Sequence, residues 1–90
     1  MPLEKAPLEK RRAIRGNVEK IDMNQNGPSL LSIRNERGDL IKAFADKQKM
    51  RPWHEAGMEN DMHIAGVLVT DELGRNSITH YTLSMGKMHS

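Results

Sequence analysis

The sequence lacks cysteine and has few aromatic residues, and both absences narrow what the protein can be. Without cysteine, disulfide bonds and thiolate metal sites are excluded, and the composition fits a reducing compartment such as the cytoplasm. Aromatic residues make up 3% of the chain, which excludes a large aromatic-rich core. Isoleucine, leucine, valine and seven methionines remain to build a compact core, and methionine fills irregular gaps well.

Long hydrophobic runs are also missing. No apolar segment approaches the roughly 18 residues that a transmembrane helix needs, so we expect no membrane association through a span. The first ten residues, MPLEKAPLEK, contain no hydrophobic stretch of the secretory type, and we therefore expect a cytoplasmic protein. Two prolines and a low apolar content predict that residues 1–10 form a flexible tail.

The formal net charge of +2 is small, but the charge is unevenly placed. Residues 1–20 carry six Lys or Arg side chains against three acidic ones, and the rest of the chain is nearly neutral. The excess positive charge therefore lies towards the N-terminus. A patch of this kind is suited to phosphate groups, although each such contact is weakened by salt.

Alternating apolar and polar residues predict the first strand from residue 11 onwards. Ile14 and Val18 would face a core, and Gly16 between them marks a sharp bend or bulge. The alternation slips at Lys20, where a β-bulge would return Ile21 to the core. The segment MNQNGPS that follows has the composition of a loop.

Two further strands and a connector are predicted next. SLLSIRN (29–35) alternates as a strand, and NERGD (35–39) is a hairpin turn in which Gly38 can take positive φ. DLIKAFAD (39–46) is a strand with apolar residues on both faces, so the pattern does not show which face is buried. Residues 46–61 predict a loop with one or two short helical turns, broken at Pro52 and Gly57, whose Met50, Trp53 and Met58 plug a core opening.

The segment MHIAGVLVTDELGRNSITHYTL (62–83) has the pattern of a β-hairpin. With the preceding elements it gives the order strand, loop, hairpin, helical connector, hairpin. That order, with Gly16 and Gly66 at expected bends, resembles the OB-fold. The resemblance implies an all-β, five-stranded OB-like Greek-key barrel with a short helical connector over residues 11–85, and a frayed end at 86–90. An SH3-like or other small five-stranded barrel is the alternative.

Catalytic and metal chemistry find little support in the residues. The glycines are isolated, the serines lack a triad context, and the acidic pairs Glu36/Asp39 and Asp71/Glu72 fall in turns, so we expect no enzymatic activity. His63 and His80 could face each other across the last hairpin, but a closed zinc site needs three or four ligands. We therefore expect no metal and no cofactor.

Single-stranded DNA or RNA binding is the function that the OB-fold resemblance implies. OB-folds bind such strands across the second and third strands, between the first–second and fourth–fifth loops. Asn24 and Gln25 fall in one of these loops, and Asn76 ends the other. The candidate nucleic-acid-binding residues on the strands, the loops and the basic N-terminal segment are Arg11, Arg12, Arg15, Arg34, Arg37, Lys42, Phe44, Arg75 and Tyr81.

A protein-interaction or assembly module is the alternative function. Phe44, Trp53 and Tyr81 are the only aromatic side chains, which is few for a base-stacking groove. The nearly neutral body, the methionine content and the edges of a five-stranded sheet would suit a protein partner or a homo-oligomer. Such a partner would dock by β-strand addition at a sheet edge.

Overall fold

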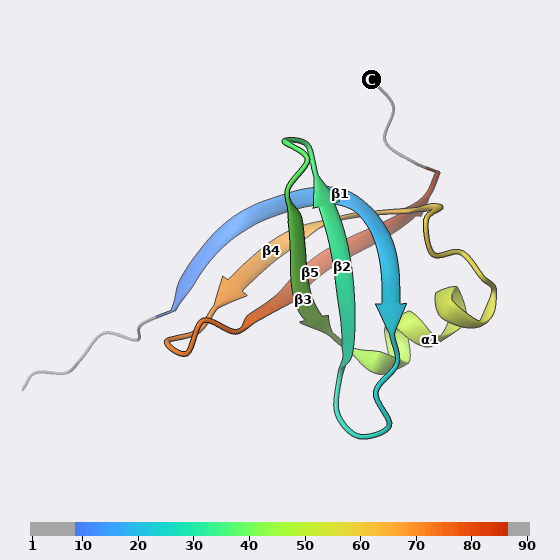
Figure 1. Cartoon of the computed structure of the whole chain (residues 1–90), viewed down its shortest axis with the longest axis horizontal. Helices are drawn as coiled ribbons and strands as arrows, with labels where there is room; N and C mark the ends of the chain where they lie inside the picture. Colours follow the sequence, from blue (N-terminus) through green and yellow to red (C-terminus); the bar gives the residue numbers. More distant parts are fainter. Residues whose placement is uncertain (1–8, 87–90) are drawn as a thin grey trace, which may run out of the picture.

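The described residues, 9–86 of a computed structural model of the chain, form five strands and one helix (Figure 1). The predicted all-β fold with a short helical connector is confirmed. The elements are β1 (Lys10–Asp22), β2 (Ser29–Asn35), β3 (Leu40–Ala45), α1 (Lys47–Glu55), β4 (Met62–Thr70) and β5 (Asn76–Met85).

The strands close into a ring in the order β1-β2-β3-β5-β4. All neighbouring pairs are antiparallel except β3 and β5, which are parallel. Within residues 9–86 these two strands pair at one position, Phe44 with Ser77. The ring is thus held strongly along four seams and weakly at the fifth.

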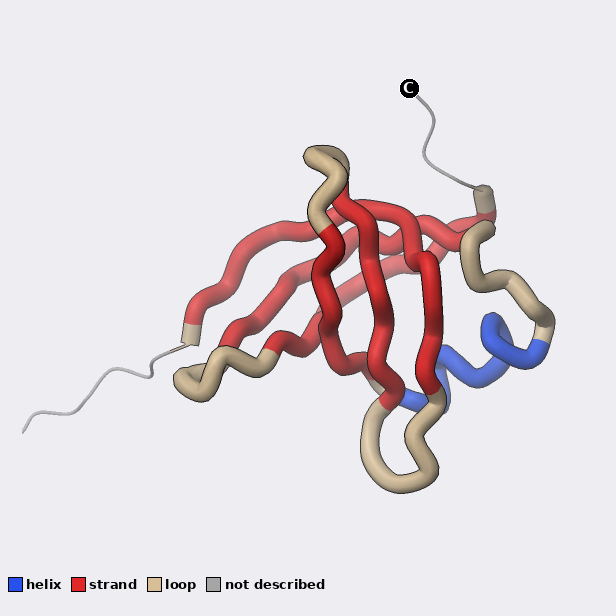
Figure 2. Tube along the Cα trace, in the orientation of Figure 1, coloured by secondary structure: helices blue, strands red, loops and turns tan. Residues whose placement is uncertain are grey.

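β1 is the longest strand, and it belongs to two parts of the ring. Its first nine residues pair with β4, from Lys10 opposite Thr70 to Val18 opposite Met62, and the residues from Gly16 to Asp22 pair with β2. In Figures 1 and 2 it arches across the molecule between these two partners. One strand therefore joins the β2–β3 and β4–β5 hairpins.

The bend of β1 depends on Gly16, as the sequence predicted. A Cβ atom at this position would collide with the backbone carbonyl of Arg34 on β2, so only glycine allows the two strands to approach this closely. The predicted bulge is also present, because the register shifts between Val18 and Lys20. The shift returns Ile21 to the interior, where it is 2% exposed.

The core is aliphatic and fills the inside of the ring. It consists of Ile14, Val18, Ile21, Leu31, Ile33, Ala43, Ala45, Met50, Met62, Ile64, Leu68 and Ile78. Met50 comes from α1 and is fully buried, and Trp53 and Met58 pack partly buried against the same core. The prediction that these three residues plug an opening of the core is therefore confirmed.

The predicted break at Pro52 is wrong, because α1 continues through it to Glu55. Proline removes the hydrogen bond to the Gln48 carbonyl, but Gln48 is exposed and water can satisfy that group. The Asp46 side chain caps the start of the helix by accepting from the Gln48 N–H at 2.9 Å. Gly57, with φ of 69°, lies just beyond the helix end as expected.

The structure shows which face of β3 is buried. Ala43 and Ala45 are buried with Ile41 partly buried, whereas Leu40 and Lys42 are exposed and Phe44 is half-buried on the outer side. Leu40 and Phe44 therefore belong to the outer surface, and their apolar character explains why alternation did not separate the faces.

Most of the predicted flexible tail and of the predicted frayed end, residues 1–8 and 87–90, lies outside the described residues. β1 begins at Lys10, one residue before the predicted start of the barrel. Among the described residues, no helix has the length and apolar character that crossing a bilayer requires.

Candidate ligand-binding surfaces

A shallow hollow lies where the β1–β2 loop, β3 and the β4–β5 turn meet. Its volume is about 290 Å³, and it is lined by Pro28, Phe44, Asp71, Arg75, Asn76 and Ser77. We call it the Phe44 hollow. Two loops and two strands that are distant in sequence thus contribute to one surface.

Hydrogen bonds fix the polar wall of the Phe44 hollow. The Asn76 amide nitrogen donates to the Lys42 carbonyl at 3.1 Å, which joins β5 to β3 beside their single pairing position. The Thr70 hydroxyl donates to the Asn76 side-chain oxygen at 2.6 Å. Because the amide nitrogen and the amide oxygen of Asn76 are both hydrogen-bonded, Asn76 positions the β4–β5 turn relative to β3.

The β4–β5 turn is organised around Asp71. Its carboxylate accepts from the backbone N–H groups of Leu73 and Arg75 and from the Arg75 Nε, each at 2.9 Å. The hydrogen bond from the Arg75 backbone is the largest cause that lowers the pKa of Asp71. Arg75 therefore lines the hollow while it is paired with Asp71, and the Asp71 carboxylate partly neutralises its charge.

The outer face of β2 and β3 extends from the hollow. Cross-strand pairing sets Leu30 beside Phe44, Ser32 beside Lys42, and Arg34 beside Leu40. Lys42 is exposed, and no ion pair with it occurs among the described residues. Phe44 and Lys42 thus offer an apolar ring and a positive charge two residues apart on one face.

Arg34 lies on the same face but is held by Glu19 of β1. Its Nε and Nη2 donate to the two carboxylate oxygens at 3.0 and 3.2 Å, and its Nη1 donates to the Gly38 carbonyl at 2.9 Å. The side-chain hydrogen bond with Glu19 is the main reason that the pKa of Arg34 is raised. Arg34 therefore ties β1, β2 and the β2–β3 turn together, which is a structural role.

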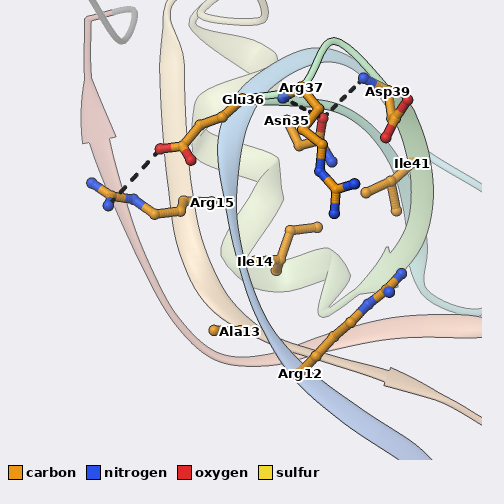
Figure 3. Close-up of a pocket in the computed structure, with 9 residues that line it drawn as sticks. All are labelled: Arg12, Ala13, Ile14, Arg15, Asn35, Glu36, Arg37, Asp39 and Ile41. Carbon is orange, nitrogen blue, oxygen red and sulfur yellow. Dashed lines mark hydrogen bonds and ion pairs between the residues drawn. The ribbon is translucent and has the colours of Figure 1, made fainter.

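A second hollow, of about 380 Å³, lies between the first half of β1 and the β2–β3 turn (Figure 3). Ile14 and Ile41 form its apolar part, and Arg12 and Arg37 supply guanidinium groups on opposite sides. We call it the arginine hollow. Arg15 also lines it, but its side chain is directed outwards to Glu36, 4.0 Å away.

The remaining candidates lie apart from both hollows. Arg11 is exposed on β1 and pairs with Glu9 at 3.3 Å. Tyr81 is half-buried on β5, with the Lys49 ammonium of α1 5.7 Å from its ring centre, and burial is the main cause that raises its pKa. Neither residue lines the Phe44 hollow.

Histidines gather no metal site in the described part of the chain. The register pairs His63 with Ser84, so the last hairpin does not set His63 opposite His80. His54 instead pairs with Glu59, its Nδ1 2.9 Å from the carboxylate, which also accepts from the Ile21 N–H at 3.3 Å. Residues 9–86 contain no group of three or more acidic or histidine side chains arranged to hold a metal ion.

The structure thus divides the nine predicted residues into smaller groups. Lys42, Phe44 and Arg75 come together around the Phe44 hollow, and Arg12, Arg15 and Arg37 around the arginine hollow. Arg11, Arg34 and Tyr81 belong to neither. Sequence reasoning missed Pro28 and Ser77 as lining residues, although Pro28 lies in the loop that was expected to form one wall.

No protein-family model matches the chain, and comparison with curated proteins gives no significant match. Within residues 9–86, the Phe44 hollow and the arginine hollow are two surfaces on which aromatic, apolar and charged side chains converge.

Proposed function

We propose that the protein is a non-catalytic binding module that holds a short single-stranded nucleic acid across β3 at the Phe44 hollow. The observation that carries the proposal is the convergence of an aromatic ring with polar loop groups in one surface depression. Phe44 forms its apolar side, and Arg75 and Asn76 form the polar side. Single-strand binding proteins combine such stacking surfaces with positive charge along the backbone path.

The arrangement of the strands supports the same proposal. The ring order β1-β2-β3-β5-β4 with a helix between β3 and β4 resembles that of OB-folds, which bind single strands beside the first–second and fourth–fifth loops. The Phe44 hollow lies between those two loops. The fold resemblance makes nucleic-acid binding a reasonable expectation, and the side chains at the hollow provide the groups that such binding would use.

The charges predict modest affinity. Lys42 is the exposed cation nearest to Phe44 along β3, whereas Arg75 is bonded to Asp71 within the same hollow. For single strands, each neutralised phosphate contributes roughly −0.7 to the slope of log affinity against log salt. One or two such contacts give a slope of about −0.7 to −1.4, which is shallow for a nucleic-acid-binding protein.

Fluorescence anisotropy with a labelled mixed-sequence oligonucleotide tests the proposal. Phe44→Leu keeps an apolar side chain but removes the stacking ring, and should weaken binding by about 1–3 kcal/mol. Phe44→Tyr should retain binding. Lys42→Gln should reduce both affinity and salt slope, whereas the matched control Arg51→Gln, at an exposed position of α1, should change neither.

Two results would overturn the proposal. One is the absence of binding tighter than about millimolar at low salt, for DNA and RNA alike. The other is binding that Phe44→Leu and Lys42→Gln leave unchanged, because the bound strand would then lie elsewhere on the protein.

A further inference from the structure

The first half of β1 has a free backbone edge beside the arginine hollow. β1 has 13 residues and β2 has 7, and their pairing begins only at Gly16. Among the described residues, Lys10–Arg15 pair with β4 on one side and with no strand on the other. In an antiparallel pair, alternate residues direct their N–H and C=O groups away from the partner. These residues therefore present unpaired backbone groups along the line that β2 would follow if it were longer.

Side chains around this edge are mainly positive. This part of β1 and the β2–β3 turn carry five cationic residues and three acidic ones in residues 9–15 and 36–39: Lys10, Arg11, Arg12, Arg15 and Arg37 against Glu9, Glu36 and Asp39. The two ion pairs among them, Arg11–Glu9 at 3.3 Å and Arg15–Glu36 at 4.0 Å, are exposed and leave Lys10, Arg12 and Arg37 against the single carboxylate of Asp39. Arg12 and Arg37 form no ion pair within residues 9–86, and they flank the apolar side chains of Ile14 and Ile41 (Figure 3).

We propose that this edge binds an extended acidic peptide segment of a partner protein by β-strand addition, separately from the Phe44 hollow. The added strand continues the line of β2 and bonds to the outward backbone groups of Lys10–Arg15. Its acidic side chains meet Arg12 and Arg37, and an apolar side chain enters between Ile14 and Ile41. The volume of the hollow, about 380 Å³, accommodates such a side chain.

The charge argues against a second copy of this chain as the occupant. Pairing two such edges would bring the arginines of one β1 against those of the other, and like charges on neighbouring strands destabilise the pairing. Positively charged edge strands are a known means by which proteins avoid joining to their own copies. A nucleic acid would use the charge but not the backbone N–H and C=O groups in alternation, so the edge favours a peptide.

The test uses the full chain and a fluorescein-labelled peptide of about six residues that alternates glutamate and valine. Its control replaces the valines with proline, which keeps the charge but removes backbone donors. The first peptide should bind saturably and perturb the amide NMR signals of Lys10–Arg15, and the control should bind about tenfold more weakly or not at all. Equal binding of the two peptides, or no binding, would overturn strand addition.

Paired variants locate the site. Arg12→Gln with Arg37→Gln should weaken the peptide by about tenfold, and Arg12→Glu with Arg37→Glu should abolish binding. Lys20→Glu with Arg51→Glu makes the same change in total charge at exposed positions elsewhere and should leave binding unchanged. If an oligonucleotide instead displaces the peptide and shifts the same amide signals, the edge is a nucleic-acid surface and the peptide proposal is wrong.

Discussion

Removing the Met50 side chain should reveal how much the barrel depends on α1. The Met50 side chain is fully buried in the core, with 0% of its surface exposed to solvent. Met50→Ala leaves a cavity at the end of the ring, and buried substitutions of this size cost about 2–5 kcal/mol. A domain of this length has a total stability of about 4–12 kcal/mol, so a loss of about 3 kcal/mol removes at least a quarter of it.

Urea unfolding measures this loss, and the single tryptophan makes the experiment specific. Trp53 lies on α1 three residues after Met50, so its fluorescence reports the helix while circular dichroism reports the sheet. For a slope of about 1 kcal/mol per molar urea, the midpoint should fall by about 3 M. Met50→Leu should cost less than about 1.5 kcal/mol, and exposed Arg51→Ala should stay within about 0.5 kcal/mol of the parent.

Two outcomes would refute this account of α1. The first is a loss below about 1 kcal/mol for Met50→Ala, which would mean that the barrel end is closed without this side chain. The second is a fluorescence transition that precedes the circular dichroism transition in the unmodified protein. The helix would then unfold independently and could not be part of the cooperative core.

Two further outcomes follow from the bend of β1 and from the β4–β5 turn. Gly16→Ala should destabilise the protein by roughly 1–3 kcal/mol in urea unfolding, because the new Cβ meets the backbone of Arg34, which cannot rotate away. A neutral effect would mean that the strands are further apart than described. Because the pKa of Asp71 is lowered in the folded state, its stabilising contribution is present above the unfolded value of about 3.9 and is lost as pH falls through the lower folded pKa. The stability difference between the parent and Asp71→Asn should therefore be largest near neutral pH and shrink in acid. A difference that stays constant from pH 7 to about pH 3 would show that the Asp71 pKa is not lowered.

Local signals in the sequence predicted much of the fold. Gly16 within an alternating strand indicated close approach, and the slip at Lys20 indicated the bulge that buries Ile21. Gly38, in the β2–β3 turn, has a positive φ of 87°, as the sequence predicted. Each of these features depends on the backbone of a few consecutive residues, which is why reading the chain locally was sufficient.

Features that depend on register were not predictable in the same way. Glu19 and Arg34 lie 15 positions apart, and their ion pair forms only because β1 and β2 align as they do around the bulge. The sequence offered Arg34 as a nucleic-acid contact, since its partner could not be recognised. Pro52 was predicted to break the helix, but the Asp46 cap and the burial of Met50 stabilise α1 on both sides of the proline, so the helix continues through it.

The free edge beside the arginine hollow was likewise not predictable from the sequence. Arg11, Arg12 and Arg15 were recognised as a basic group, but their common position along an unpaired strand edge was not. That position follows from the unequal lengths of β1 and β2. Arg37 joins the group only because the β2–β3 turn folds back towards β1 (Figure 3).

The pairing of β1 with β4 also sets the order in which the molecule can fold during synthesis. Lys10 pairs with Thr70, so β1 waits, after it leaves the ribosome, for about 60 further residues before it gains this neighbour. At about 5–20 residues per second, the delay is on the order of seconds. Long-range pairing of this kind also gives slow folding, typically on the order of milliseconds to seconds. During that interval both edges of the arginine-rich half of β1 are open, and its positive charge keeps nascent copies from pairing with one another.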